Sequence, residues 1–172
     1  MISGGSLETS YRAVQLHWHW GKNGGPGSEH TIDGEQYPME TSSSVNEKYE
    51  PIIRSLGNIK QSGFNVSLSG LSLDMLIPEE EDMTIYYRYE GSLTIPGCSE
   101  AVVWTVFEHT VPLSEAQLSA FSALQFSNGE PMTGTFRPVQ PLNSRKVYRS
   151  GSGAVLASTI LLVISVMAST GL

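Results

Sequence analysis

The feature that most constrains this chain is a run at residues 15–21 in which two histidines alternate with two tryptophans. Successive side chains of an extended strand point to opposite faces, so His17 and His19 share one face and the tryptophans share the other. Two imidazoles side by side provide two ligands of a divalent metal site, for which zinc is a common occupant. Gln15 has the same parity and is placed to accept a hydrogen bond from a histidine ring nitrogen.

The histidine pair does not complete a zinc site, because a catalytic zinc takes three protein ligands and keeps one open position. The chain has two further histidines, His30 and His109. We interpret His109 as a partly buried, hydrogen-bonded residue, because it lies on the strand after Trp104 and near a loop. On residue types alone, packing of the pair between strands stays an alternative to metal binding.

The composition bounds the class of protein. A length of 172 residues suffices for one domain, and 40% hydrophobic with 16% charged residues is typical of a globular chain. The net charge of −7, with no basic block, argues against a nucleic-acid partner. Cys98 is the single cysteine, so the chain can close no internal disulfide and build no cysteine-rich zinc site.

The two ends of the sequence make conflicting predictions about location. Residues 1–5 lack the basic region and apolar core of a signal peptide. Residues 154–172 are apolar or small and uncharged, which predicts a glycolipid-anchor signal, with a retained membrane anchor as the alternative. We therefore divide the chain into a domain at 1–148 and a hydrophobic tail at 149–172. Either kind of tail requires delivery to a membrane, so the sequence indicates a fragment or a spliced form.

The domain is predicted to be mainly β (α+β), a mostly antiparallel sheet with short peripheral helices. Alternating side chains predict strands at 11–20 and 101–111, the latter central in the sheet, and β-prone residues predict a further strand at 84–89. The pair Asp33-Gly34 predicts a turn that suits a hairpin. The glycine-rich stretch 21–27 predicts a loop.

Two helices are predicted at the periphery of this sheet. Residues 50–60 place apolar side chains on one helical face, and Ser114 to Gln117 form a capping box that opens a second helix. The acidic run 79–82 is interpreted as a solvated loop. Asn65 begins an Asn-Val-Ser sequon, a candidate glycosylation site that has meaning only in a secreted chain, and chance occurrence is the simpler interpretation.

Four separated motifs together resemble the α-class carbonic anhydrases, in both their order and their spacing. They are Leu16–Gly21, Gly27–Gly34, Ser92–Pro96 and Phe136–Leu142. The resemblance extends from about residue 4 to residue 148 with one internal gap, and the tail resembles that of the membrane-bound vertebrate branch. The resemblance implies a fold with a large, twisted, mostly antiparallel sheet. It also implies zinc-dependent reversible hydration of carbon dioxide to bicarbonate, on the extracellular face of the plasma membrane.

The resemblance also implies roles for particular residues. His17 and His19 resemble zinc ligands, and Gln15 and Glu40 resemble the residues that orient a ligating histidine from behind. Thr94 is similar to the hydroxyl that accepts a hydrogen bond from zinc-bound hydroxide and donates one to Glu29. The remaining implied roles are the walls of the apolar carbon dioxide pocket (Leu93, Val102 and Trp104) and a buried structural histidine near Tyr89 (His30).

The chain departs from the family pattern in three places. After Glu40, Ser42 stands where the third zinc histidine is expected, and the match resumes near Val45, so two strands are predicted to be missing. The N-terminal part of the family domain, with the proton-shuttle histidine and the disulfide partner of Cys98, has no counterpart. Thr135 replaces the usual asparagine.

These departures decide what activity we expect. With two histidine ligands in place of three, zinc affinity falls steeply, so carbon dioxide hydration is expected to be impaired in this chain. Losing strands from the middle of a sheet also exposes two edges with unpaired backbone groups. The alternatives are a catalytically inactive carbonic-anhydrase-related binding module and a non-functional splice product.

Overall fold

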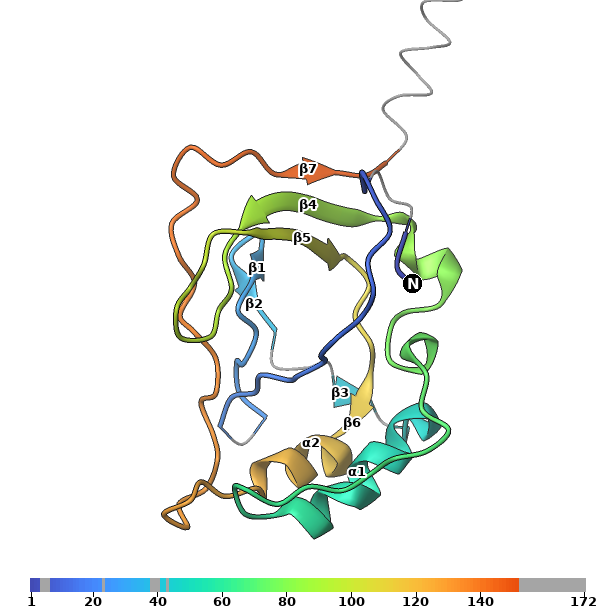
Figure 1. The fold of residues 1–172 in the computed structure, drawn as a ribbon, viewed down its shortest axis with the longest axis vertical. Helices are drawn as coiled ribbons and strands as arrows, with labels where there is room; N and C mark the ends of the chain where they lie inside the picture. Colours follow the sequence, from blue (N-terminus) through green and yellow to red (C-terminus); the bar gives the residue numbers. More distant parts are fainter. Residues whose placement is uncertain (4–6, 23, 38–40, 43, 152–172) are drawn as a thin grey trace, which may run out of the picture.

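The computed structural model describes residues 1–3, 7–22, 24–37, 41–42 and 44–151. Figure 1 shows a three-stranded sheet at one end of the molecule and the helices α1 and α2 at the other, joined by extended segments. The predicted mixture of sheet and short helices is confirmed. Within the described part, however, the strands form three small sheets instead of one continuous sheet.

The largest sheet is antiparallel and has the strand order β5-β4-β7. Its strands are β4 (Tyr86–Gly91), β5 (Val102–Phe107) and β7 (Tyr148–Arg149). The two longer strands confirm the strands predicted at 84–89 and 101–111, and they pair with Tyr89 opposite Trp104. The prediction that β5 is central is wrong, because β4 occupies the centre and no described strand pairs with the outer side of β5.

Two smaller strand pairs lie between this sheet and the helices. The strands β1 (Thr31–Ile32) and β2 (Glu35–Gln36) form the predicted hairpin. Asp33 and Gly34 have φ values of 52° and 84°, as a two-residue turn of type I′ requires. The strands β3 (Thr41–Ser42) and β6 (Leu113–Ser114) pair in parallel.

The strand predicted at residues 11–20 is wrong as a paired strand. Tyr11 forms an isolated bridge with Ile2, and residues 12–20 lie in no strand. The alternation of side chains nevertheless holds, because the rings of Trp18 and Trp20 both contact Phe121, at centroid distances of 6.1 and 5.6 Å. Alternation requires only an extended backbone, whereas a ladder also requires a neighbouring strand, which the described residues do not supply.

The helices are short and most of them form single turns. They are η1 (Glu47–Tyr49), α1 (Glu50–Leu56), η2 (Gly57–Ile59), η3 (Leu73–Met75), η4 (Glu80–Thr84) and α2 (Glu115–Ser122). The helix predicted at 50–60 is confirmed, although it tightens to a 3₁₀ helix from Gly57 onward. The acidic run was expected to be a loop, but most of it lies in η4, where its carboxylates favour the helix N-terminus.

The buried core lies between α1 and α2. Phe121 and Leu113 are the most deeply buried side chains, and Ile52, Leu56 and Leu118 complete the contact between the helices. Trp18 and Trp20 pack against this cluster from the extended N-terminal segment. The core therefore fixes one face of the histidine–tryptophan run and turns the histidines away from the helices.

Part of the predicted membrane tail lies outside the described residues, as does Glu40. Within the described ranges, no helix is both long enough and apolar enough to cross a bilayer. Asn65 lies exposed in the irregular segment after η2. Glycosylation at Asn65 and processing of the tail stay predictions.

One side chain joins the two helices. Gln117 of the confirmed capping box is only 2% exposed. Its Oε1 accepts hydrogen bonds from the backbone N–H groups of Asn46 and Ser114, at 3.0 and 3.1 Å. Its Nε2 donates to the Asn46 carbonyl at 2.8 Å and to Glu50 at 3.1 Å. The start of α2 is thereby tied to the start of α1.

Replacing Gln117 with alanine is expected to lower the free energy of unfolding by about 2–3 kcal/mol, because buried backbone groups of Asn46 and Ser114 lose their partners. Ser119→Ala, an exposed position on the same helix, is the control and should change the value by less than about 0.5 kcal/mol. Urea unfolding followed by circular dichroism measures both. Equal shifts of the two midpoints would contradict the role assigned to Gln117.

Candidate functional site

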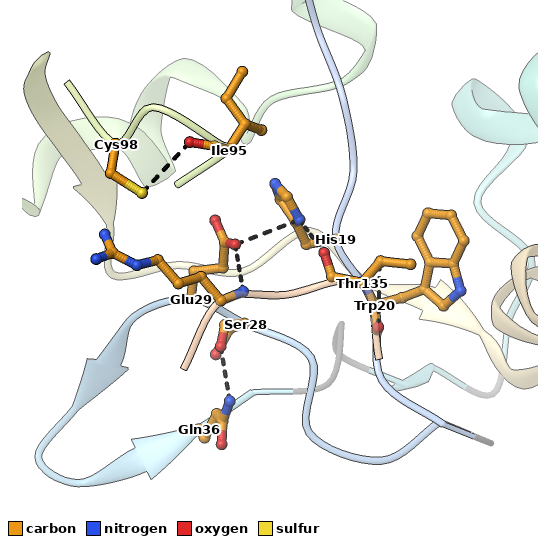
Figure 2. A network of polar contacts seen from close by, with 9 residues as sticks. His19, Trp20, Ser28, Glu29, Gln36, Ile95, Cys98 and Thr135 are labelled. Atoms are coloured by element: carbon orange, nitrogen blue, oxygen red, sulfur yellow. Dashed lines mark hydrogen bonds and ion pairs between the residues drawn. The ribbon is translucent and has the colours of Figure 1, made fainter. Parts of the chain in front are cut away.

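The histidine-bearing segment is held by a part of the chain more than 100 positions away. The backbone N–H of Trp20 donates to Thr135 Oγ1 at 3.0 Å, and the Thr135 N–H donates to the Trp20 carbonyl at 3.0 Å. The Trp20 indole donates to the Met132 carbonyl at 2.7 Å. Figure 2 shows how these contacts bring Thr135 alongside His19.

His19 is prepared to donate a lone pair. Its Nδ1 lies 2.5 Å from the Thr135 carbonyl oxygen, which can only accept, so Nδ1 carries the ring proton and Nε2 carries the lone pair. His19 Nε2 is buried and has no hydrogen-bond partner in the structure. A buried ring nitrogen with a free lone pair, fixed through its other nitrogen, is the arrangement that a metal-ligating histidine requires.

His17 lies beside His19 but is more open to solvent. The two ring centroids are 5.1 Å apart and the planes are nearly perpendicular. The prediction that the two imidazoles share one face is therefore confirmed. Gln15 is exposed, and no hydrogen bond joins it to His17. Its expected role, to accept a hydrogen bond from the second ring nitrogen of His17, stays a prediction.

A glycine-rich loop brings Glu29 to the same place. Gly21 and Gly27 are buried and their backbones are in contact, so that a Cβ on Gly27 would overlap the Gly21 nitrogen and one on Gly21 would overlap the Pro26 oxygen. No other residue fits this approach. The loop closes on itself, and Glu29 follows two residues later, next to His19.

Glu29 is oriented by the backbone. Its buried carboxylate accepts a hydrogen bond from the Arg137 N–H at 2.8 Å, and the same oxygen lies 3.4 Å from His19 Nδ1. Figure 2 shows the Glu29 carboxylate beside His19. Sequence reasoning did not identify the Thr135 carbonyl or the Arg137 N–H as contacts, because a backbone group leaves no signal in the residue type.

A cavity of about 960 Å³ adjoins the site and is lined by Glu29, Thr94 and Trp104, among other residues. The structure thus brings the two predicted catalytic residues to one cavity, although no hydrogen bond joins Thr94 to Glu29. Of the predicted pocket walls, Trp104 lines the cavity, whereas Leu93 is 41% exposed and neither it nor Val102 lines it. The roles implied for these residues stay predictions.

His30 lies inside the same cavity but serves the fold. Its Nε2 is 2.7 Å from the Tyr89 hydroxyl, and its ring centroid is 4.7 Å from that of Trp104. The predicted contact with Tyr89 is confirmed. Burial lowers the pKa of His30 below its usual 6.5; the charge of Glu29 opposes this effect and that of Arg145 adds to it.

The described residues do not converge on a complete metal site. No group of three or more His, Cys, Asp and Glu side chains gathers among them. His109 instead lies 2.7 Å from Asp82, so the predicted hydrogen bond is confirmed. The prediction that His109 is partly buried is wrong, because the residue is exposed just after the end of β5. Ser42, at the position of the expected third ligand, pairs through β3 with Ser114 of β6. His17 and His19 thus suit zinc in their chemistry but supply two ligands.

The lowered pKa of His30 predicts a pH dependence of stability. The unfolded chain binds this proton more readily, so the contribution of neutral His30 is complete above pH 6.5 and is lost as the pH falls through the folded pKa. The melting temperature should therefore decrease below pH 6.5, and the decrease should be smaller in His30→Gln. Thermal melts at several pH values measure this effect, with His109→Gln, an exposed histidine, as the control. Parallel curves for wild type and His30→Gln would contradict it.

Comparison with known families gives a match over most of the chain. The family model described as eukaryotic-type carbonic anhydrase matches residues 1–43 and 40–151. The match is thus divided into two segments that meet at residues 40–43.

Individual relatives carry the same description. The chain is 34% identical to carbonic anhydrase 4 of Rattus norvegicus, over 91% of this chain and 62% of that protein. It is 35% identical to carbonic anhydrase 15 of Mus musculus, over 99% of this chain and 64% of that protein. It is 31% identical to carbonic anhydrase 12 of Homo sapiens, over 96% of this chain and 57% of that protein. The chain spans about three fifths of the length of these relatives.

Proposed function

The chain belongs to the eukaryotic-type carbonic anhydrase family, and from this premise we propose that its site is a depleted form of a zinc site for the reversible hydration of carbon dioxide. His17 and His19 are the two ligands that remain. Thr94 and Glu29 are the residues that would orient the attacking oxygen. Carbon dioxide and bicarbonate are the substrate pair.

The single observation that carries this proposal is the state of His19. A histidine that served only packing would have a partner for each ring nitrogen or would expose one to water. Here the Thr135 carbonyl fixes the proton on Nδ1, and the lone pair of Nε2 is left buried and without a partner. A metal ion is the ligand that satisfies such a nitrogen without adding a proton.

The residues around the pair fit the proposed chemistry. Zinc, when bound, acidifies water so that a nucleophile is available near neutral pH. The Arg137 N–H holds the Glu29 carboxylate in one orientation, as an acceptor near the histidines. Thr94 lies on the same cavity, where its hydroxyl would select the direction of the attacking oxygen. Trp104 gives this cavity an apolar wall, which suits carbon dioxide because that substrate has no strong polar group.

We propose further that activity is impaired by the loss of the third ligand together with its strand. The division of the family match at residues 40–43 supports an internal gap at this point. The alignment with the mouse relative runs over 209 positions, against 172 residues in the whole chain, so that relative carries at least 37 positions with no counterpart here. Two histidines without a third ligand hold zinc less tightly and leave more of its coordination sphere to water.

Location at the cell surface is also a proposal. The apolar and uncharged residues 154–172 support attachment to a membrane, either as a lipid-anchor signal or as a retained anchor. A cell-surface enzyme would act on extracellular carbon dioxide and bicarbonate.

One observation favours a second candidate function, a catalytically inactive binding module of the same family. The described residues bring together two candidate zinc ligands and no third, while the cavity of about 960 Å³ beside them is retained. A non-functional splice product is the remaining alternative. Cooperative thermal unfolding would argue against that alternative, and comparison of the transcript with its exons would reveal a skipped exon between the codons of Glu40 and Val45.

Zinc binding and catalysis provide the test. The purified chain is expected to hydrate carbon dioxide at least about 100-fold more slowly than rat carbonic anhydrase 4, because a complete ligand set is missing. Zinc competition with a chromophoric chelator should show weak binding that His19→Ala abolishes. His109→Ala, outside the site, is the matched control and should leave the binding unchanged.

Each result has a distinct meaning. A rate comparable with that of the rat enzyme and abolished by a chelator would overturn the impairment. Zinc binding that His19→Ala leaves unchanged would overturn the assignment of the ligands. A folded chain with no zinc binding would replace the enzyme proposal with the binding module.

A further inference from the structure

The strand β5 has an outer edge without a partner among the described strands. The Glu108 N–H donates to the Ile85 carbonyl at 3.0 Å, and the register places Tyr86 opposite Phe107. Hydrogen-bonded pairs alternate along an antiparallel ladder, so the backbone N–H and C=O groups of Val103, Thr105 and Phe107 point away from β4. These groups form a template to which a further strand can add.

This edge lacks the features by which proteins usually protect a free strand. Residues 102–107 contain no charge and no proline, and Val103 is 47% exposed. Natural edges are usually shielded by charged side chains, prolines, bulges or a covering segment. The composition of β5 is instead that of a strand paired on both sides, which is why the sequence predicted a central position.

A second unpaired stretch lies at residues 12–19. It is extended, and no backbone hydrogen bond joins it to another described residue. Val14 is 91% exposed, although it has the same parity as the tryptophans that pack on the core. Figure 1 shows this segment and β5 without a described strand that pairs with either outer side. The chain therefore presents two open edges.

The relatives carry material that would fit between two such edges. At least 37 aligned positions of the mouse relative have no counterpart here, and the family match divides at residues 40–43. Two strands of the length of β5 with their connections need about 15–20 residues, so the missing segment is long enough to supply both.

We propose that the outer edge of β5 and residues 12–19 together form a receptor site for a two-stranded β segment supplied by another polypeptide. The partner is an uncharged hairpin of alternating apolar residues, which suits the uncharged composition of residues 102–107. Main-chain hydrogen bonds to residues 103, 105 and 107 give affinity, and apolar side chains facing Val14 and Val103 give register. This site is independent of zinc and extends beyond the proposed function.

Hydrogen exchange of the full chain with a synthetic peptide tests the proposal. The peptide has the sequence that mouse carbonic anhydrase 15 carries opposite the gap, and a scrambled peptide of the same composition is the control. A chelator is present throughout, so the result does not depend on the zinc proposal. The amides of residues 103, 105, 107 and 12–19 are expected to exchange at least about 10-fold more slowly with the native peptide only.

A pair of variants separates strand addition from unspecific apolar binding. Val103→Lys places a charge on the edge without removing a hydrogen bond to β4, and it should weaken peptide binding at least about 10-fold. Leu68→Lys introduces the same charge at an exposed apolar residue outside β5 and should leave the binding unchanged. Circular dichroism confirms that both variants fold like the wild type.

Three results would overturn the proposal. They are equal protection by native and scrambled peptides, no protection of either stretch by the native peptide, and unchanged binding by Val103→Lys. Protection of residues 103–107 in the absence of peptide, together with sedimentation as a dimer, would assign the edge to a second copy of the chain instead.

Discussion

The contact of Trp18 and Trp20 with Phe121 is the interaction on which the candidate site depends. The two indole rings bind an extended segment, which has no ladder of its own, to the core between α1 and α2. Because side chains alternate along an extended backbone, this contact turns His17 and His19 to the opposite side. Burial of aromatic surface thus replaces strand pairing as the interaction that orients the two candidate ligands.

Backbone groups complete the arrangement that this packing begins. The Thr135 carbonyl fixes the proton of His19, and the Arg137 N–H fixes the carboxylate of Glu29. Both groups belong to one segment, so a single piece of chain sets the tautomer of a proposed ligand and the orientation of its neighbouring carboxylate. The contact with His19 does not depend on which side chain stands at position 135, because it uses the main-chain carbonyl.

The sheet of β5, β4 and β7 has an unpaired outer edge among the described residues. The segments that form the core between α1 and α2 are all present in the described chain, whereas the outer side of β5 has no described partner strand. The family match divides at residues 40–43, and neither β5 on its outer side nor residues 12–19 have a described strand beside them. Under the proposal of an internal gap, a depleted zinc site and an open sheet edge have a single cause.

Short-range chemistry was enough to predict the Asp33-Gly34 turn, the capping box of α2, the existence of the strands β4 and β5, and the common face of His17 and His19. These features depend on residues a few positions apart, whose side chains act on their own backbone. Short-range chemistry did not predict the edge position of β5, the unpaired state of residues 12–20, or the hydrogen bond between His19 and the Thr135 carbonyl. Each of these depends on which distant segment is present: Thr135 lies 116 positions from His19 and acts through a carbonyl that every residue possesses.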